Sequence, residues 1–240
     1  TTDCFPKAAF CKVNIGNVEV TLAGIAKGSQ MIAPDMGTML SFLFTDAKIS
    51  AKVLQSCLNR AVDRSFNCIS VDGDTSTSDT VFLSATGQVN RQPKIDGAKD
   101  PLLRDFRAAL EDITGELARM IVRDGAKKGR LLSCDVIGAE SQRAARNIGR
   151  SIVDSTLVRV GIADAEPRVG RIVMAVGKAG ERAERDLLGI AIGGVQIAVA
   201  GEALPDFNAK AVVKHLKADQ IHFTINIGIG RGKARVWSAL

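Results

Sequence analysis

The hydrophobic residues change their spacing along the chain, and this change constrains the fold more than any other feature. Residues 12–15 and 18–22 alternate apolar and polar side chains on either side of Gly16-Asn17, which is typical of a β-hairpin. Residues 102–122 instead carry apolar side chains at helical spacing, which predicts a long amphipathic helix. A chain with both spacings must bury strands against helices, so the sequence predicts an α+β fold.

The pattern changes again after Asp124-Gly125. Short strands at 131–136 and 220–229 and a short helix at 141–153 are expected there. Because strands and helices do not alternate strictly along the chain, we expect layered α+β structure in two lobes. The predicted lobes are residues 1–130 and 131–240.

Composition and charge exclude two classes of protein. The chain is 46% hydrophobic, but no apolar run approaches the roughly 20 residues that span a bilayer, so no membrane association is expected. The net charge is +6, yet basic and acidic residues are interleaved, as in 180–186, and only 4% of residues are aromatic. Nucleic-acid-binding surfaces gather basic residues and offer rings for stacking, so nucleic acid is not an expected partner.

The cysteine and histidine content indicates the compartment and argues against a metal. Five cysteines are present, an odd number, and no pair has the C-x-x-C spacing. A disulfide framework or zinc site is therefore not expected, and a reducing cytoplasm fits best. The two histidines, His215 and His222, have no acidic neighbour in the sequence and are interpreted as structural.

Two further segments have simple structural interpretations. Asp72-Gly73-Asp74 starts like a calcium loop, but the twelfth position is Leu83 rather than Glu, which rejects an EF-hand. The hydroxyl-rich run that follows is expected to cap a helix starting near Thr80 and to line a site wall. Residues 228–232 are rich in glycine but precede a β-type run, so a β-turn is predicted rather than a phosphate loop.

Gly37-Thr38 opens an apolar, strand-like run and is the first candidate for chemistry. A threonine hydroxyl is a weak nucleophile unless a base lies beside it. Cleavage of the chain before Thr38 would supply that base, because the new α-amine has a pKa of about 8. Gly37 has no Cβ and would impose little steric demand on the scissile peptide. By itself, however, such a pair is more often only the start of a strand.

Several other segments of the chain accompany this pair in order and carry a resemblance to a known family. They are Thr1-Thr2-Asp3, Ile25-Ala26-Lys27-Gly28-Ser29, Met31-Ile32-Ala33-Pro34, Thr38-Met39-Leu40, Thr45-Asp46-Ala47, and the runs 72–80 and 170–177. With them, essentially the whole chain resembles the bifunctional ornithine acetyltransferase / N-acetylglutamate synthase family. The resemblance implies a layered α/β sandwich of the self-cleaving N-terminal-nucleophile type.

The resemblance also implies an activity and the residues that carry it. Family members cleave themselves before a threonine, which then carries an acetyl group from N-acetylornithine to glutamate in arginine biosynthesis. This similarity makes Thr38 the nucleophile, with the cut between Gly37 and Thr38, and makes Lys27 and Thr1 substrate contacts. No metal or bound cofactor is implied, ornithine is the leaving product, and acetyl-CoA is an alternative acetyl donor in the family.

The resemblance extends to assembly and to the ends of the chain. Cleaved family members assemble as heterotetramers of α and β pieces. The family's Thr-Gly oxyanion hole would lie upstream of residue 1, and its C-terminal substrate contacts would lie beyond Leu240. We therefore expect this sequence to be a fragment that lacks the N-terminal part and the last C-terminal residues.

Four departures from the family pattern leave alternatives open. Gly37 stands where the family has Ala, Gln30 where it has Gly, Ala126 where it has a substrate-contacting Glu, and Arg168-Val169 where it has Asn-Trp. One alternative is a catalytically impaired or truncated member with no activity alone. The other is a related amide hydrolase in which water accepts the acyl group.

Overall fold

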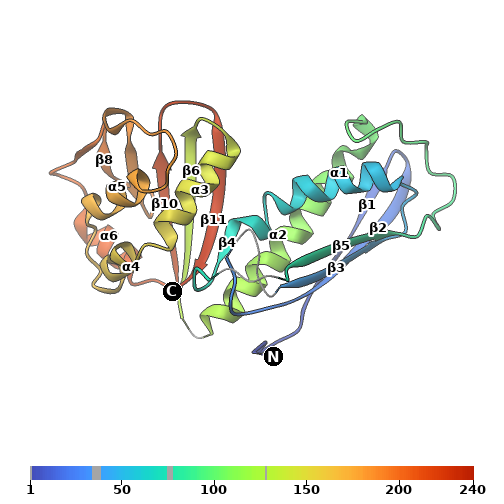
Figure 1. Ribbon diagram of the computed structural model, residues 1–240, viewed down its shortest axis with the longest axis horizontal. Coiled ribbons are helices and arrows are strands. Elements are labelled where there is room, and N and C mark those ends of the chain that lie inside the picture. Colours follow the sequence, from blue (N-terminus) through green and yellow to red (C-terminus); the bar gives the residue numbers. More distant parts are fainter. Residues whose placement is uncertain (1, 34–38, 75–77, 128) are drawn as a thin grey trace. The chain divides into compact units, whose positions relative to one another are not determined.

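The computed structural model in Figure 1 describes residues 2–33, 39–74, 78–127 and 129–240. The chain forms two compact units, one of Thr1–Asn67 with Asp74–Gly125 and one of Cys68–Gly73 with Ala126–Leu240. Each unit has its own sheet. The functional division of the chain into lobes 1–130 and 131–240, with the cleavage site in the first, stays a prediction.

The first unit is built on a four-stranded sheet with the strand order β1-β2-β3-β5. Its strands are β1 (Lys7–Ile15), β2 (Val18–Lys27), β3 (Leu40–Thr45) and β5 (Thr80–Ala85). β1 and β2 form the predicted hairpin, and Gly16 adopts a φ of +61° at its turn, a conformation that favours glycine. β3 pairs antiparallel with β2 and parallel with β5.

The helix predicted near Thr80 is wrong, because these residues form β5. Val81 and Leu83 are partly buried while Phe82 and Ser84 are exposed. This alternation of burial is that of a strand, and parallel pairing with β3 provides partners for the backbone N–H and C=O groups. Pairing with a distant strand therefore outweighed the local hydroxyl-rich sequence that suggested a helix cap.

Two helices line one face of this sheet. They are α1 (Ala51–Val62) and α2 (Arg104–Ala126). The short 3-10 helix Pro101–Leu103 directly precedes α2. Figure 1 shows them side by side, and Arg60 of α1 donates to Glu111 of α2 across 2.5 Å. The long helix predicted at 102–122 is thus confirmed, with its apolar stripe, including Leu110 and Leu117, fully buried.

The opposite face of this sheet carries exposed apolar side chains. The large ones are Phe10, Ile25, Phe42, Phe44 and Phe82. Phe42 and Phe82 face each other across β3 and β5, with their rings stacked at 5.6 Å between centroids. An exposed apolar patch of this kind is typical of a contact surface rather than of a solvated sheet face.

The second unit contains a seven-stranded mixed sheet with the order β4-β11-β6-β10-β7-β8-β9. The strands are β4 (Ile69–Ser70), β6 (Leu131–Ala139), β7 (Gly189–Ile192), β8 (Val195–Val199), β9 (Glu202–Ala203), β10 (Gln220–Asn226) and β11 (Gly232–Ala239). β6 lies near the centre, parallel to β10 and antiparallel to β11. Residues 227–231 form the connection between β10 and β11, so the glycine-rich run precedes a strand, as predicted.

The described part of the second unit also contains four α-helices. They are α3 (Gln142–Val153), α4 (Thr156–Ala163), α5 (Val169–Gly177) and α6 (Ala209–Leu216). α3 packs on β6 and β11, and its buried residues join one core with the inward side chains of the sheet. Ser141 caps α3 by accepting a hydrogen bond from the Ala144 N–H. Among the described residues, none of the helices is long and apolar enough to cross a membrane.

Gly149 allows α3 to approach β11, which leads to a stability prediction. A Cβ at this position would lie 2.7 Å from Val236 Cγ2 and 3.4 Å from Val136 Cγ2, both in the core. We expect Gly149→Ala to lower the free energy of unfolding by about 1–3 kcal/mol, since overpacking exceeds the gain in helix propensity. Urea unfolding would measure the loss, and adding Val236→Ala should recover part of it; a more stable single variant would contradict the prediction.

Candidate functional site

The predicted site residues fall into two groups. Thr38, Gly37 and Thr1 lie outside the described residues. Lys27 is described: it is the last residue of β2 and pairs with Leu40 at the start of β3. Leu40 is two residues from Thr38 in the sequence, so Lys27 lies beside the strand that follows the predicted nucleophile.

The Lys27 side chain borders an open depression on the first unit. The depression has a volume of about 420 Å³ and is lined by Asp3, Cys4, Phe5, Pro6, Ala26 and Lys27. Within the described part of the chain, no ion pair joins the Lys27 ammonium to a carboxylate. Within those residues, no carboxylate therefore competes through an ion pair with a negatively charged ligand for this ammonium.

A hydrogen-bonded network holds the N-terminal segment against the loop that follows Lys27. Asp3 Oδ1 accepts the Gly28 N–H at 2.8 Å, and the hydroxyls of Thr2 and Ser29 are 2.6 Å apart. Gly28 has a φ of +137°, which other residues rarely adopt. The two segments that the family resemblance assigns to substrate contact are thus bound directly to each other.

Lys7 is the buried centre of this network, and sequence analysis missed it. Its ammonium lies 2.6 Å from Asp3 Oδ1 and 2.5 Å from Asp124 Oδ2, and the side chains of Lys7 and Asp124 are both 0% exposed. Both oxygens of Asp124 also accept the Cys4 N–H at 3.1 Å. Lys7 and Asp124 are 117 residues apart, so no local pattern could have indicated their contact.

The network shifts the titration of both carboxyl groups. Burial raises the pKa of Asp3, but the Gly28 N–H and the Lys7 ammonium outweigh it, so that the pKa lies below its ordinary value. The pKa of Asp124 is lowered in the same way, with burial opposed by Lys7 and by the Cys4 N–H. Both groups are therefore held in their charged form.

The lowered pKa values of Asp3 and Asp124 predict that acid destabilises the first unit. A carboxyl group whose pKa is lower in the folded chain stabilises the fold above its unfolded pKa, and this contribution is lost as pH falls through the folded pKa. We expect the free energy of unfolding to fall between about pH 5 and pH 2. Urea titrations across this range would test it, and Asp124→Asn should flatten the slope; an unchanged slope would contradict the assignment.

Asp79 is a second residue whose role was not predicted. Its Oδ1 accepts the Met39 N–H at 2.5 Å, while the Thr80 N–H donates to the Met39 carbonyl at 3.0 Å. Met39 directly follows Thr38, so these two contacts fix the backbone next to the predicted nucleophile. Asp79 and Met39 also line an open cavity of about 540 Å³, together with polar side chains of α1 such as Gln55 and Asn59.

The histidines have more polar surroundings than the sequence suggested. His222 Nδ1 lies 2.9 Å from Ser133 Oγ, and its Nε2 lies 3.4 Å from Asp135 Oδ2, so the prediction that it lacks an acidic partner is wrong. Ser133 and Asp135 are on β6, the parallel neighbour of β10. His215 Nε2 accepts the His222 N–H, and burial followed by the charge of His222 lowers the pKa of His215.

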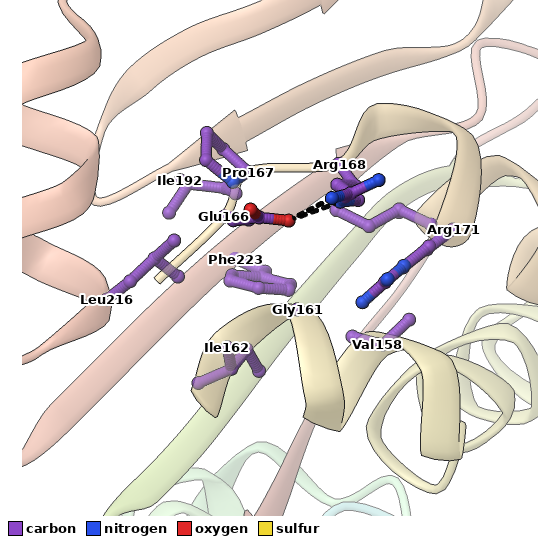
Figure 2. Close-up of a pocket in the computed structure, with 11 residues that line it drawn as sticks. Val158, Gly161, Ile162, Glu166, Pro167, Arg168, Arg171, Ile192, Leu216 and Phe223 are labelled. Atoms are coloured by element: carbon purple, nitrogen blue, oxygen red, sulfur yellow. Dashed lines mark hydrogen bonds and ion pairs between the residues drawn. The ribbon is translucent and has the colours of Figure 1, made fainter. Parts of the chain in front are cut away.

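Figure 2 shows a cavity in the second unit that is too small for a substrate. It has a volume of about 10 Å³, room for about one water, and lies between α4, the start of α5 and the apolar side chains Ile192 and Phe223. Glu166 and Arg168 form an ion pair at its rim. Arg168, one of the four departures from the family pattern, is thus engaged in a local surface contact.

The other departures have different positions. Gln30 is exposed to solvent, and Ala126 is the last residue of α2. Gly37 lies outside the described residues. An alanine at the end of α2 offers no carboxylate, so this position cannot pair with the cation of a substrate.

Comparison with a solved structure defines the class of fold. The crystal structure of the arginine biosynthesis bifunctional protein ArgJ from Bacillus halodurans matches with a TM-score of 0.76 at 33% identity, over 84% of this chain and 94% of that chain. The chain therefore has the mixed α+β fold of that protein, and the predicted fold class is confirmed.

Sequence comparisons identify the family. The ArgJ family model matches residues 1–239. The arginine biosynthesis bifunctional proteins ArgJ of Mesorhizobium japonicum and Gluconobacter oxydans are each 47% identical, over 240 and 238 residues. This chain belongs to the ArgJ family, as the resemblance predicted. It spans 58% and 56% of the length of these two relatives.

Proposed function

We propose that this chain is the nucleophile-bearing part of an acetyltransferase that moves an acetyl group from N²-acetylornithine to glutamate. The family match over residues 1–239 carries the proposal. It is supported by the Lys27 ammonium, which forms no ion pair with a described carboxylate and lies beside β3, the strand that begins two residues after Thr38. The depression beside β3 is lined by both Asp3 and Lys27. The Lys27 ammonium suits an amino-acid substrate, because carboxylates bind ammonium groups through charge-assisted hydrogen bonds.

The proposed reaction proceeds in two steps through an ester on Thr38. After cleavage between Gly37 and Thr38, the α-amine of Thr38 takes the hydroxyl proton while Oγ attacks the acetyl carbonyl of N²-acetylornithine. The C–N bond breaks, ornithine leaves, and the proton passes to its amine. The amine of glutamate then attacks the acetyl-Thr38 ester and regenerates the hydroxyl.

The remaining components of the proposal follow from the same resemblance. Lys27 binds a substrate carboxylate and the Thr1 hydroxyl donates to the ligand. No bound cofactor takes part, since the ester stores the activated acetyl group, and acetyl-CoA is a second donor. Cleaved pieces assemble as an α/β heterotetramer in a reducing cytoplasm, where disulfides do not persist.

One observation favours a weaker function. Ala126 replaces the carboxylate that the family places there, which removes a partner for the cation of ornithine. The second candidate is therefore a member of the family with impaired transfer. Ala126→Glu should raise the rate with N²-acetylornithine in that case and have little effect otherwise.

Mass spectrometry after incubation with N²-acetylornithine tests the main proposal. We expect the chain to separate into residues 1–37 and 38–240, and the peptide that begins at Thr38 to gain one acetyl group. Adding glutamate should remove the label and yield N-acetylglutamate. Free acetate in the absence of glutamate would instead identify an amide hydrolase, and a folded, cleaved sample without label would exclude the covalent intermediate.

A further inference from the structure

The buried cluster of Lys7, Asp3 and Asp124 contacts the residues on either side of Lys27, the lysine proposed to bind substrate. Lys7 is the first residue of β1 and pairs across the hairpin with Ala26, the residue before Lys27. Its ammonium is fully buried and contacts one carboxylate from the N-terminal segment and one from the last turn of α2. The Phe5 carbonyl, at 3.5 Å, is a third acceptor, so all three ammonium protons have partners.

Asp3 connects this cluster to Lys27. It accepts the N–H of Gly28, the residue next to Lys27, and is itself 20% exposed at the edge of the depression that Lys27 lines. Two positive charges act on Asp3, those of Lys7 and Lys27. Lys7 contacts Asp3 directly, whereas no direct ion pair joins Asp3 to Lys27 within the described residues.

We propose that Lys7 is a positioning residue that keeps the Lys27 ammonium available by occupying the Asp3 carboxylate. This inference rests on the proposed role of Lys27 in binding a substrate carboxylate. Without Lys7, Asp3 and Asp124 would carry two uncompensated charges close together. The Asp3 carboxylate would then attract Lys27, the second cation that acts on it, and compete with the substrate.

A purely structural role of Lys7 is the rival explanation, and the two differ in their response to a second substitution. Breaking a buried ion pair by removing one partner destabilises a protein, whereas neutral replacement of all partners is often tolerated. Competition for Lys27 depends only on the charge of Asp3. Asp3→Asn retains an oxygen that accepts the Gly28 N–H but removes this charge.

The experiment measures substrate affinity in the folded chain. We expect Lys7→Met to raise the KM for glutamate about tenfold or more, the usual effect of losing a charge-assisted contact, with a smaller change in kcat. Acetylation of Thr38 by p-nitrophenyl acetate, which has no carboxylate, should stay unchanged. The matched control is Lys12→Met, an exposed lysine on the same strand, which should leave both values unchanged.

The neutralised variants decide between the explanations. Lys7→Met with Asp3→Asn should restore the KM for glutamate to within a few-fold of the original. Where the single variant fails to fold, Lys7→Met with Asp124→Asn keeps the Asp3 charge and should show the raised KM, which further addition of Asp3→Asn should restore. An unchanged KM in folded Lys7→Met, or a raised KM that Asp3→Asn does not restore, would overturn the proposal.

Chemical labelling tests Lys7 independently of the proposed reaction. Competitive acetylation with acetic anhydride reports how readily each amine reacts, and pairing with a carboxylate slows this reaction. Lys27 should label several-fold more slowly in Lys7→Met and recover with Asp3→Asn. If no variant transfers acetyl groups but this pattern holds, the proposed function fails while the role of Lys7 stands; equal labelling in all variants overturns that role.

Discussion

Replacing Thr38 with Ala should abolish both the covalent acetyl group and cleavage of the chain. Thr38→Ala removes the only atom that can form the ester in the proposed mechanism, and removal of a nucleophile lowers the rate of such enzymes by roughly a thousandfold or more. Intact-mass spectra should show one uncut chain of 240 residues without label. Transfer to glutamate, followed by product analysis, should fall to background.

Two variants control for indirect effects of the Thr38 substitution. Thr38→Ser keeps a hydroxyl and should retain measurable cleavage and labelling. Thr86→Ala changes an exposed threonine after β5 and should behave like the original chain, because its backbone hydrogen bond to Thr45 is retained. A label that survives Thr38→Ala would assign the nucleophile to another residue and remove the basis of the mechanism.

Local patterns predicted those elements whose structure depends on neighbouring residues. The β1–β2 hairpin follows from alternation around Gly16-Asn17, and α2 follows from a helical apolar stripe in a segment long enough to define it. The same reasoning failed for β5, whose strand conformation depends on pairing with β3, more than thirty residues earlier in the chain. It also missed α4, a helix of eight residues with few turns in which to show a period.

The candidate site shows the same limit. The family resemblance indicated Lys27 because that lysine lies within a recognisable segment. Lys7 and Asp124 gave no such signal, since each is an ordinary charged residue in the sequence and their contact depends on the docking of α2 near the start of β1. Burial of a lysine without exposed atoms is a property of the folded chain, and such residues are almost always paired.

Asp79→Ala should slow acetyl transfer by about a hundredfold without unfolding the chain. Asp79 accepts the N–H of Met39, the residue bonded to the predicted nucleophile, and the N–H of the next residue, Thr80, donates to the Met39 carbonyl. Loss of the first contact would let the backbone before Leu40 shift while β3 remains paired with β5. Displacement of a reacting group by about 1 Å can cost roughly a hundredfold in rate.

The matched variants separate position from charge at Asp79. Asp79→Asn keeps an oxygen that can accept the Met39 N–H, so this variant should retain most of the activity. If the negative charge itself were required, Asp79→Asn and Asp79→Ala would be equally slow. Asp96→Ala alters an exposed carboxylate in the loop before α2 and should have no effect on rate. Rates of labelling at Thr38 would be compared under conditions where circular dichroism shows all variants folded. Full labelling rates in Asp79→Ala would mean that the β3–β5 pairing alone fixes Met39, and that the carboxylate at the end of the hydroxyl-rich run has no part in positioning the nucleophile.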